Sequence, residues 1–149
     1  MPVWQPILLG GIWQQTGGRS WGVTDGREAG QREVERRAEE YELMPIRWPE
    51  GWPNNTLKAM RAAIFAQSIG RAVAFSLAAF RQAFAGGKDL SDVDNVLIAA
   101  AACELHPNAV LKAIDRTKYD VLPIGITRDG RWALTADEPE RMAISDRRT

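Results

Sequence analysis

An apolar stripe between residues 73 and 84 constrains the fold of this chain more than any other feature. Its members recur at i, i+4, i+7 and i+11, and they are Val73, Leu77, Phe80 and Phe84. This spacing places side chains on one face of an α-helix, which then faces the core. The pattern stops at Gly86-Gly87, a pair typical of a helix C-terminus. The sequence therefore predicts a helix here that buries this stripe.

Three further helices are predicted around it, each with its own start or stop signal. Asn55 or Thr56 can cap a helix that begins at Leu57, and Gly70 allows a break after it. Ser91 is the expected cap of a helix over about 92–104, which is apolar on most sides, and Pro107 is expected to start a helix over about 108–116. With an amphipathic charged helix over about 27–41, opened by an Asp25/Glu28 capping box, they predict a bundle over residues 27–117.

The two ends of the chain have a different character. Residues 3–9 mix β-branched, aromatic and aliphatic side chains, which favours a short strand, and Pro6 favours an edge position. Residues 10–26 are rich in Gly, Ser, Thr, Gln and Trp, which is typical of a long binding loop. In the tail, residues 118–149, Asp129-Gly130 between two apolar segments favours a hairpin. We expect a single, mostly α domain of the α+β class over residues 1–149.

Composition limits the classes of partner. Nineteen basic and nineteen acidic residues give no net charge, which argues against nucleic acid or an anionic membrane as partner. Cys103 is the only cysteine and His106 the only histidine, so we expect no zinc site and a reduced, cytoplasmic setting. Cys103 follows an alanine run, which indicates a buried, packing thiol. His106 before Pro107 is expected either to cap a helix or to lie exposed in a loop, and not to act as a general base. No apolar run is long enough to span a bilayer.

The order of strand, Gly-rich loop, charged helix, Pro-rich loop and packed helices resembles one family. The segments that carry the likeness are 4–12 (WQPILLGGI), 16–17 (TG), 47–49 (RWP), 53–56 (PNNT), 79–84 (AFRQAF) and 89–92 (DLSD). They are similar to the DsbA-like thioredoxin superfamily, in the branch of 2-hydroxychromene-2-carboxylate isomerases and kappa-class glutathione transferases. The resemblance implies that residues 27–117 are the helical insertion of that fold and residues 3–9 one strand of its sheet.

The same resemblance implies a glutathione-dependent isomerase acting on a small aromatic or chromene-like substrate, with a homodimer as an open option. The family's serine or cysteine near the first thioredoxin helix would lie upstream of Met1, so no catalytic residue is expected in this chain. Gln14 and Gly18 stand where relatives contact glutathione or substrate. Pro123 is either the counterpart of the family's cis-proline beside glutathione, or an ordinary proline in a turn or at the start of a strand.

The role of Trp48 and two alternative functions of the chain stay open at this point. Trp48, between prolines, either lines an aromatic pocket for a bicyclic substrate or anchors its loop on the bundle. The chain could instead be a DsbA-family thiol-disulfide oxidoreductase relative, whose mark would be an upstream Cys-x-x-Cys. It could also be a non-catalytic helical interaction module or remnant, which would bind a partner through an uncovered apolar face.

Overall fold

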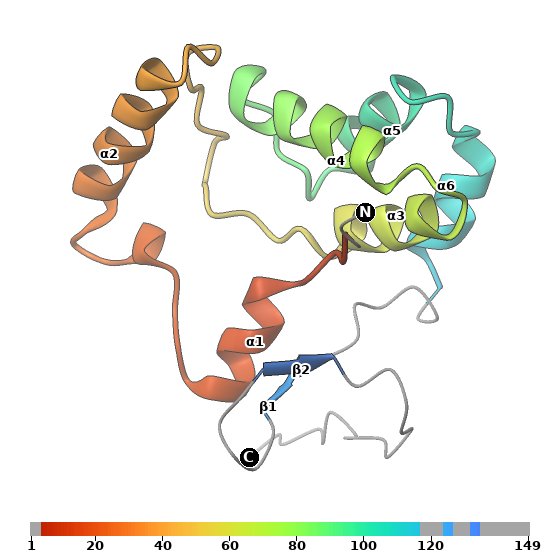
Figure 1. Cartoon of the computed structure of the whole chain (residues 1–149), viewed down its shortest axis with the longest axis horizontal. Helices are drawn as coiled ribbons and strands as arrows, with labels where there is room; N and C mark the ends of the chain where they lie inside the picture. Colours follow the sequence, from red (N-terminus) through yellow and green to blue (C-terminus); the bar gives the residue numbers. More distant parts are fainter. Residues whose placement is uncertain (1–3, 117–123, 127–131, 135–149) are drawn as a thin grey trace.

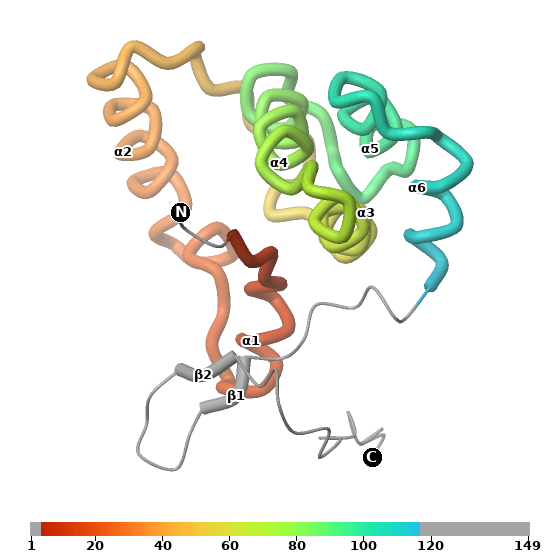
Figure 2. The backbone as a smooth tube through the Cα atoms, turned by 45° about the vertical axis from the view of Figure 1, so that its right-hand side comes forward, coloured from red at the N-terminus to blue at the C-terminus, as the bar shows by residue number. Residues whose placement is uncertain are grey.

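The computed structural model describes residues 4–116, 124–126 and 132–134. Figure 1 shows a mostly helical molecule in which α3, α4, α5 and α6 pack together and α2 stands apart from them. Figure 2, from a second direction, shows the same separation between α2 and the bundle. The helices are α1 (Leu9–Thr16), the 3-10 turn η1 (Trp21–Val23), α2 (Arg27–Glu40), α3 (Leu57–Ser68), α4 (Ala72–Phe80), the π-helical η2 (Arg81–Ala85), α5 (Val93–Ala101) and α6 (Pro107–Ile114).

The core of the bundle is lined mainly by alanine. Buried alanines face one another from α3, α4, η2 and α5: Ala59, Ala62, Ala63, Ala66, Ala79, Ala83, Ala99 and Ala100. Alanine's small side chain lets neighbouring helix backbones approach closely, and dense packing then needs few large side chains. Phe75, Val96 and Val110 are the largest fully buried ones among the described residues. Burying each of these side chains stabilises the folded state by about 1.5–3 kcal/mol.

The prediction that the 73–84 stripe is buried is wrong for most of its length. Val73, Leu77 and Phe80 lie exposed on α4. The buried face carries Phe75 and Ala79 instead, which recur at the same helical spacing. The small Ala79 can lie against α3 and α5 where the larger Leu77 would hold the helices apart. Only Phe84, at the end of the stripe, packs partly against the core.

Several helices end in the same hydrogen-bonded motif. After α3 the amide of Arg71 donates to the carbonyl of Ala66, 2.7 Å away, around Gly70 at φ 72°. After α5 the amide of Leu105 donates to Ala100 around Glu104, whose φ is 63°. This is the Schellman arrangement, in which a left-handed residue turns the chain and satisfies the last carbonyls. The predicted break at Gly70 is confirmed.

Two helix starts, those of α2 and α5, differ from the predicted caps. Gly26 precedes α2 with no side-chain cap, so the Asp25/Glu28 capping box is not formed. Asp92, and not Ser91, caps α5 by accepting from the amide of Asp94. The Ser91 side chain is held by Asp89 instead, since its hydroxyl donates to that carboxylate across 2.7 Å. Asn55 accepts from the amide of Leu57 at the start of α3, and Pro107 occupies the first turn of α6 as predicted.

The strand predicted over residues 3–9 is wrong for its described part. Residues 4–8 have no regular structure, and α1 begins at Leu9, inside the predicted strand and loop. Pro6 cannot donate to a ladder, and no strand lies beside this segment among the described residues. It is held by a helix instead, because the side chain of Gln67 on α3 donates to the carbonyl of Trp4 across 2.7 Å. The loop predicted over residues 10–26 accordingly contains α1 and η1.

The tail contributes one pair of short strands. β1 (Ile124–Ile126) and β2 (Trp132–Leu134) pair antiparallel, with Ile124 opposite Leu134 and Ile126 opposite Trp132. The turn predicted at Asp129-Gly130 lies outside the described residues. Within the described ranges, each helix is too short or too polar to cross a bilayer.

Candidate functional site

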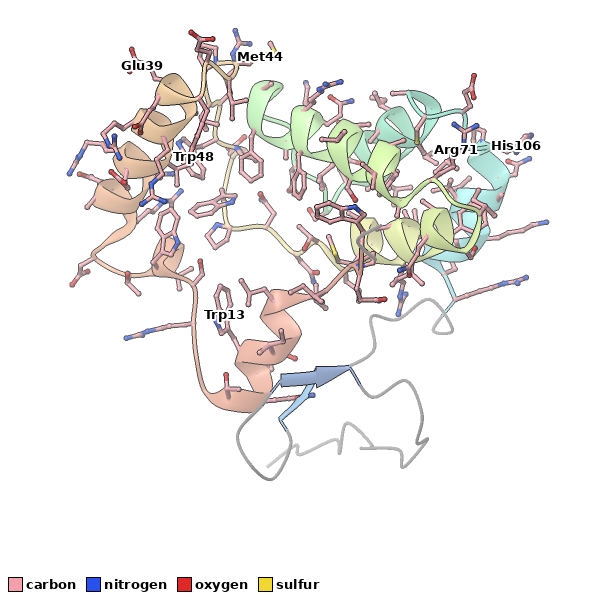
Figure 3. The ribbon with its side chains drawn as sticks, viewed as in Figure 1. Trp13, Glu39, Met44, Trp48, Arg71 and His106 are labelled. Atoms are coloured by element: carbon pink, nitrogen blue, oxygen red, sulfur yellow. The ribbon has the colours of Figure 1, made fainter. Side chains whose placement is uncertain are left out.

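A cluster of three tryptophans joins α2 and η1 to the bundle. Trp48 and Trp52 lie 4.6 Å apart between ring centroids with their planes tilted by 57°. Trp21 lies 5.0 Å from Trp52, and Phe84 of η2 meets Trp48 edge-on at 5.8 Å. The indole nitrogen of Trp48 donates to Oε1 of Glu35 on α2, at 2.6 Å. Figure 3 shows Trp48 between α2 and the bundle. Aromatic pairs at these separations stabilise by about 0.5–1.5 kcal/mol each beyond area burial.

Two glycines make room for these rings. A Cβ added at Gly30 on α2 would lie 2.4 Å from the ring of Trp21, and one added at Gly22 would lie 2.4 Å from the ring of Trp52. The space between the segments is therefore filled by the protein's own side chains. Trp48 anchors its loop, and it lines neither of the two hollows described below. Of the two roles left open by the sequence, the anchoring role fits these contacts.

A shallow, mainly apolar cleft with a few polar side chains brings Gln14 and Gly18 together. Its volume is about 420 Å³, and it lies between the end of α1 and the loop before α3. Arg19 supplies a cation to its lining, and the side chains of Asn54 and Asn55 supply amides. Gly18 lies under the ring of Trp13, where an added Cβ would come within 2.7 Å of the indole. The cleft holds two of the predicted site residues, but their role in binding glutathione stays a prediction.

The other two predicted site residues are not in this cleft. Trp48 belongs to the tryptophan cluster, and Pro123 lies outside the described residues. Among the described residues, the peptide bond between Trp52 and Pro53 is cis, and Pro53 lines the cleft. Arg19 and the two asparagines were missed by sequence reasoning. Asn54 and Asn55 directly follow Pro53, and this polar pair was the signal that could have indicated a surface site.

A larger, mainly apolar groove runs between α4–η2 and α5. Its volume is about 710 Å³, and Met44, Leu77 and Ile98 supply its large apolar side chains. Arg71 and Glu104 form an exposed ion pair of 3.3 Å on its lining, and Arg81 lines it as well. Exposed ion pairs of this kind contribute at most about 1 kcal/mol. The groove was missed because the sequence predicted Leu77 to be buried.

Cys103 and His106 have structural positions. Cys103 is buried, and its Sγ lies 3.2 Å from the carbonyl oxygen of Ala100, the geometry of a weak donated hydrogen bond. Burial raises the pKa of this thiol, which keeps it protonated. Nδ1 of His106 accepts from the amide of Asn108 at the start of α6, 3.2 Å away. The packing role of Cys103 and the capping role of His106 are both confirmed.

In the ranges that the structure describes, no three acidic, Cys or His side chains are placed to hold a metal ion.

The charged face of α2 is an ion-pair network. Glu33 accepts from the guanidinium groups of Arg36 and Arg37, with contacts of 2.7–3.1 Å. These hydrogen bonds, with Arg36 contributing most, lower the pKa of Glu33 from its usual 4.5 to about 2. Arg36 also bonds Glu40, one helical turn further on, at 3.0 Å. All the partners are on the same helix, so the network supports α2 itself.

Comparison with known proteins gives short but strong matches to D-alanine–D-alanine ligases. The chain is 95% identical over 41 residues to the ligase of Streptomyces avermitilis, which is 28% of this chain and 11% of the relative. It is 90% identical over 41 residues to that of Streptomyces coelicolor, which is 28% of this chain and 10% of the relative. It is 85% identical over 40 residues to that of Streptomyces griseus, which is 27% of this chain and 10% of the relative. The chain thus spans about a tenth of these relatives' length. The sequence matches no protein-family model, and no solved structure matches it.

These matches overturn the resemblance to DsbA-like proteins. The relatives are named as ligases, so the interpretations as a glutathione-dependent isomerase, a kappa-class glutathione transferase or a DsbA-family oxidoreductase are wrong. The alternative of a non-catalytic helical interaction module or remnant stays a prediction, because the match covers 28% of this chain. The resemblance depended on short Gly, Pro and Trp motifs and on a strand at residues 3–9, a segment that forms no strand where it is described. Such motifs recur in unrelated loops because they suit turns. What the comparisons show is kinship over one short stretch with D-alanine–D-alanine ligases.

Proposed function

We propose that this chain supplies a segment of a D-alanine–D-alanine ligase, and acts in joining two D-alanine molecules through an amide bond. The observation that carries the proposal is the 95% identity over 41 residues with the Streptomyces avermitilis ligase. Packing alone tolerates many substitutions that keep volume and polarity pattern. Near-identity over a whole stretch therefore supports a close kinship, and with it a role of this stretch in the same enzyme activity.

The proposal assigns a contribution and not the whole reaction. Joining two amino acids in water requires an activated carboxyl group, positioned reactants and shielding from water. The matched stretch amounts to 11% of the Streptomyces avermitilis ligase, so the proposal has this stretch working with further ligase residues. We place the activity in the cytoplasm, in keeping with the single, buried, unpaired thiol of Cys103.

Complementation of a truncated ligase tests the proposal. A Streptomyces avermitilis ligase that lacks the matched stretch would be mixed with the purified chain, D-alanine and a nucleoside triphosphate, and D-alanyl-D-alanine would be measured by mass spectrometry. We expect the chain to restore dipeptide formation well above the level of the truncated enzyme. The control is a version of the chain in which the matched stretch is replaced by a Gly/Ser linker of equal length, which should restore none.

Two results would count against the proposal. One is that the chain restores nothing while a synthetic peptide of the ligase's own stretch does. The other is that the linker version restores as much dipeptide as the intact chain, since restoration would then not depend on the shared residues.

A further inference from the structure

We propose that the exposed face of α4 and α5 is a self-association surface, and that it receives the segment 39–44 of a second copy of this chain. The face consists of four large apolar side chains that are about half exposed, Val73 (46%), Leu77 (51%), Phe80 (59%) and Ile98 (54%). We call it the α4–α5 face. The segment 39–44 contributes two more exposed apolar side chains, Leu43 (62%) and Met44 (65%). This inference is independent of the proposed ligase function.

The α4–α5 face is continuous. Met44, Leu77 and Ile98 line the same groove of about 710 Å³. Val73 and Phe80 lie one helical turn on either side of Leu77 on α4, because residues four and three positions apart share a helix face. The face therefore joins the exposed sides of α4 and α5 into one apolar surface.

The exposed apolar area is a substantial part of what a dimer interface needs. Side chains of this size, exposed by half or more, each present on the order of 100 Å² to water, and together they reach several hundred Å². A standard interface buries about 800 Å² per partner. The burial of such an area outweighs the cost of association when the fit is good, whereas a lone monomer would keep it in water.

Charge complementarity indicates which occupant fits. The groove presents Arg81, which has no ion-pair partner among the residues that the structure describes, together with Arg71, which is paired with Glu104. The segment 39–44 carries Glu42 directly before the apolar Leu43 and Met44, and Glu39 three positions before Glu42. An acidic and then apolar segment matches a basic and apolar groove. The chain therefore carries both halves of the contact.

The position of Met44 makes the contact reciprocal. Met44 belongs to the acidic-apolar segment and also lines the groove of its own protomer. Figure 3 shows Glu39 and Met44 at the same end of the molecule, where α2 leads into the following loop. A two-fold axis that passes near Met44 would lay each protomer's segment on the groove of the other. Such isologous pairing is the commonest symmetry of soluble homodimers.

Sedimentation velocity over a range of concentrations tests the surface. We expect the wild-type chain to dimerise below about 100 µM, and Leu77→Glu to weaken the dimer by at least about tenfold, because it places a charge in the apolar contact. Ile7→Glu is the matched control, since Ile7 is 42% exposed but lies outside the α4–α5 face. It should associate like the wild type. A wild-type chain that stays monomeric at this concentration, or a Leu77→Glu variant that associates like the wild type, would overturn the proposal.

Charge reversal tests the occupant. Arg81→Glu and Glu42→Arg should each weaken the dimer several-fold, and the double variant should regain most of the loss, because the two charges then attract again across the interface. Both residues are exposed, so these variants fold even if a charge at Leu77 perturbs the helix, as far-ultraviolet circular dichroism would show. A double variant no tighter than either single variant overturns the assignment of segment 39–44, and points to a different partner for the groove.

Discussion

The indole nitrogen of Trp48 donates a hydrogen bond to the carboxylate of Glu35, at 2.6 Å between Nε1 and Oε1. The bond joins the Pro-rich loop to α2, while the ring of the same tryptophan meets Phe84 of η2. Trp48 therefore contacts both α2 and the end of the α4–η2 helix. The loop that the sequence offered as a substrate pocket has a mechanical role, because it fixes the position of α2 relative to the bundle.

A double-mutant cycle on this pair measures its contribution. Trp48→Phe keeps an aromatic ring but removes the donor, and Glu35→Gln removes the charge of the acceptor. We expect each change to lower the free energy of unfolding, and the two together to show a coupling energy of about 1 kcal/mol, typical of such a hydrogen bond. Urea unfolding at fixed pH gives the values. Additive losses, with no coupling, would mean that the bond contributes nothing measurable.

The tryptophan cluster predicts opposite effects for two glycine substitutions. Gly30→Ala places a Cβ 2.4 Å from the ring of Trp21 and should cost about 1–3 kcal/mol, because the ring must shift. Gly10→Ala, in α1, meets nothing within 4 Å and should stabilise by about 0.5–1 kcal/mol, because alanine is the better helix former. Thermal unfolding of both variants is the measurement. Equal effects at the two positions would contradict the close ring contact at Gly30.

The sequence predicts where the helices of the bundle lie better than which faces they bury. Gly70 and Pro107 mark a helix end and a helix start that the structure confirms, because these residues act through local backbone geometry. The buried face of α4 could not be predicted in this way. Leu77 and Phe75 both belong to stripes of helical period, and the choice between them depends on how closely α3 and α5 approach, which is set by alanines elsewhere in the chain.

The candidate site was predicted only in part for a related reason. Gln14 and Gly18 share a cleft because they lie four positions apart, at the end of α1 and just after it. Their neighbours Asn54 and Asn55 come from a distant part of the sequence, and nothing local links the two segments. The predicted strand at residues 3–9 failed because an apolar segment forms a strand only where a partner strand can complete its hydrogen bonds.

The ion pairs of α2 predict an acid-resistant carboxylate. The pKa of Glu33 is lowered to about 2, so its stabilising contribution is complete above the usual pKa of 4.5 and is lost as the pH falls through about 2. An NMR titration of the Glu33 carboxyl carbon should give a midpoint near 2. Replacing Arg36 and Arg37 by Gln should return the midpoint toward 4.5. A wild-type midpoint near 4.5 would show that solvent and salt screen these pairs completely.

The buried thiol of Cys103 predicts slow chemistry. It is covered by the bundle and its raised pKa keeps it protonated, whereas the thiolate is the reactive form. At neutral pH a disulfide reagent should react with it about a hundredfold or more slowly than with an exposed thiol, and urea should remove the difference. The matched control carries Ala102→Cys with Cys103→Ala, because position 102 is exposed on the same helix end. Equal rates for the two proteins in the folded state would contradict the burial of Cys103.

The central structural claim is that α4 buries Phe75 and leaves Leu77 uncovered, since the alanine-lined core and the α4–α5 face both depend on it. The most direct test compares Phe75→Ala with Leu77→Ala by urea unfolding, at protein concentrations low enough for the chain to be monomeric. We predict that Phe75→Ala lowers the free energy of unfolding by about 3–5 kcal/mol and Leu77→Ala by about 0.5 kcal/mol or less. A loss at Leu77 equal to or larger than that at Phe75 would contradict the account.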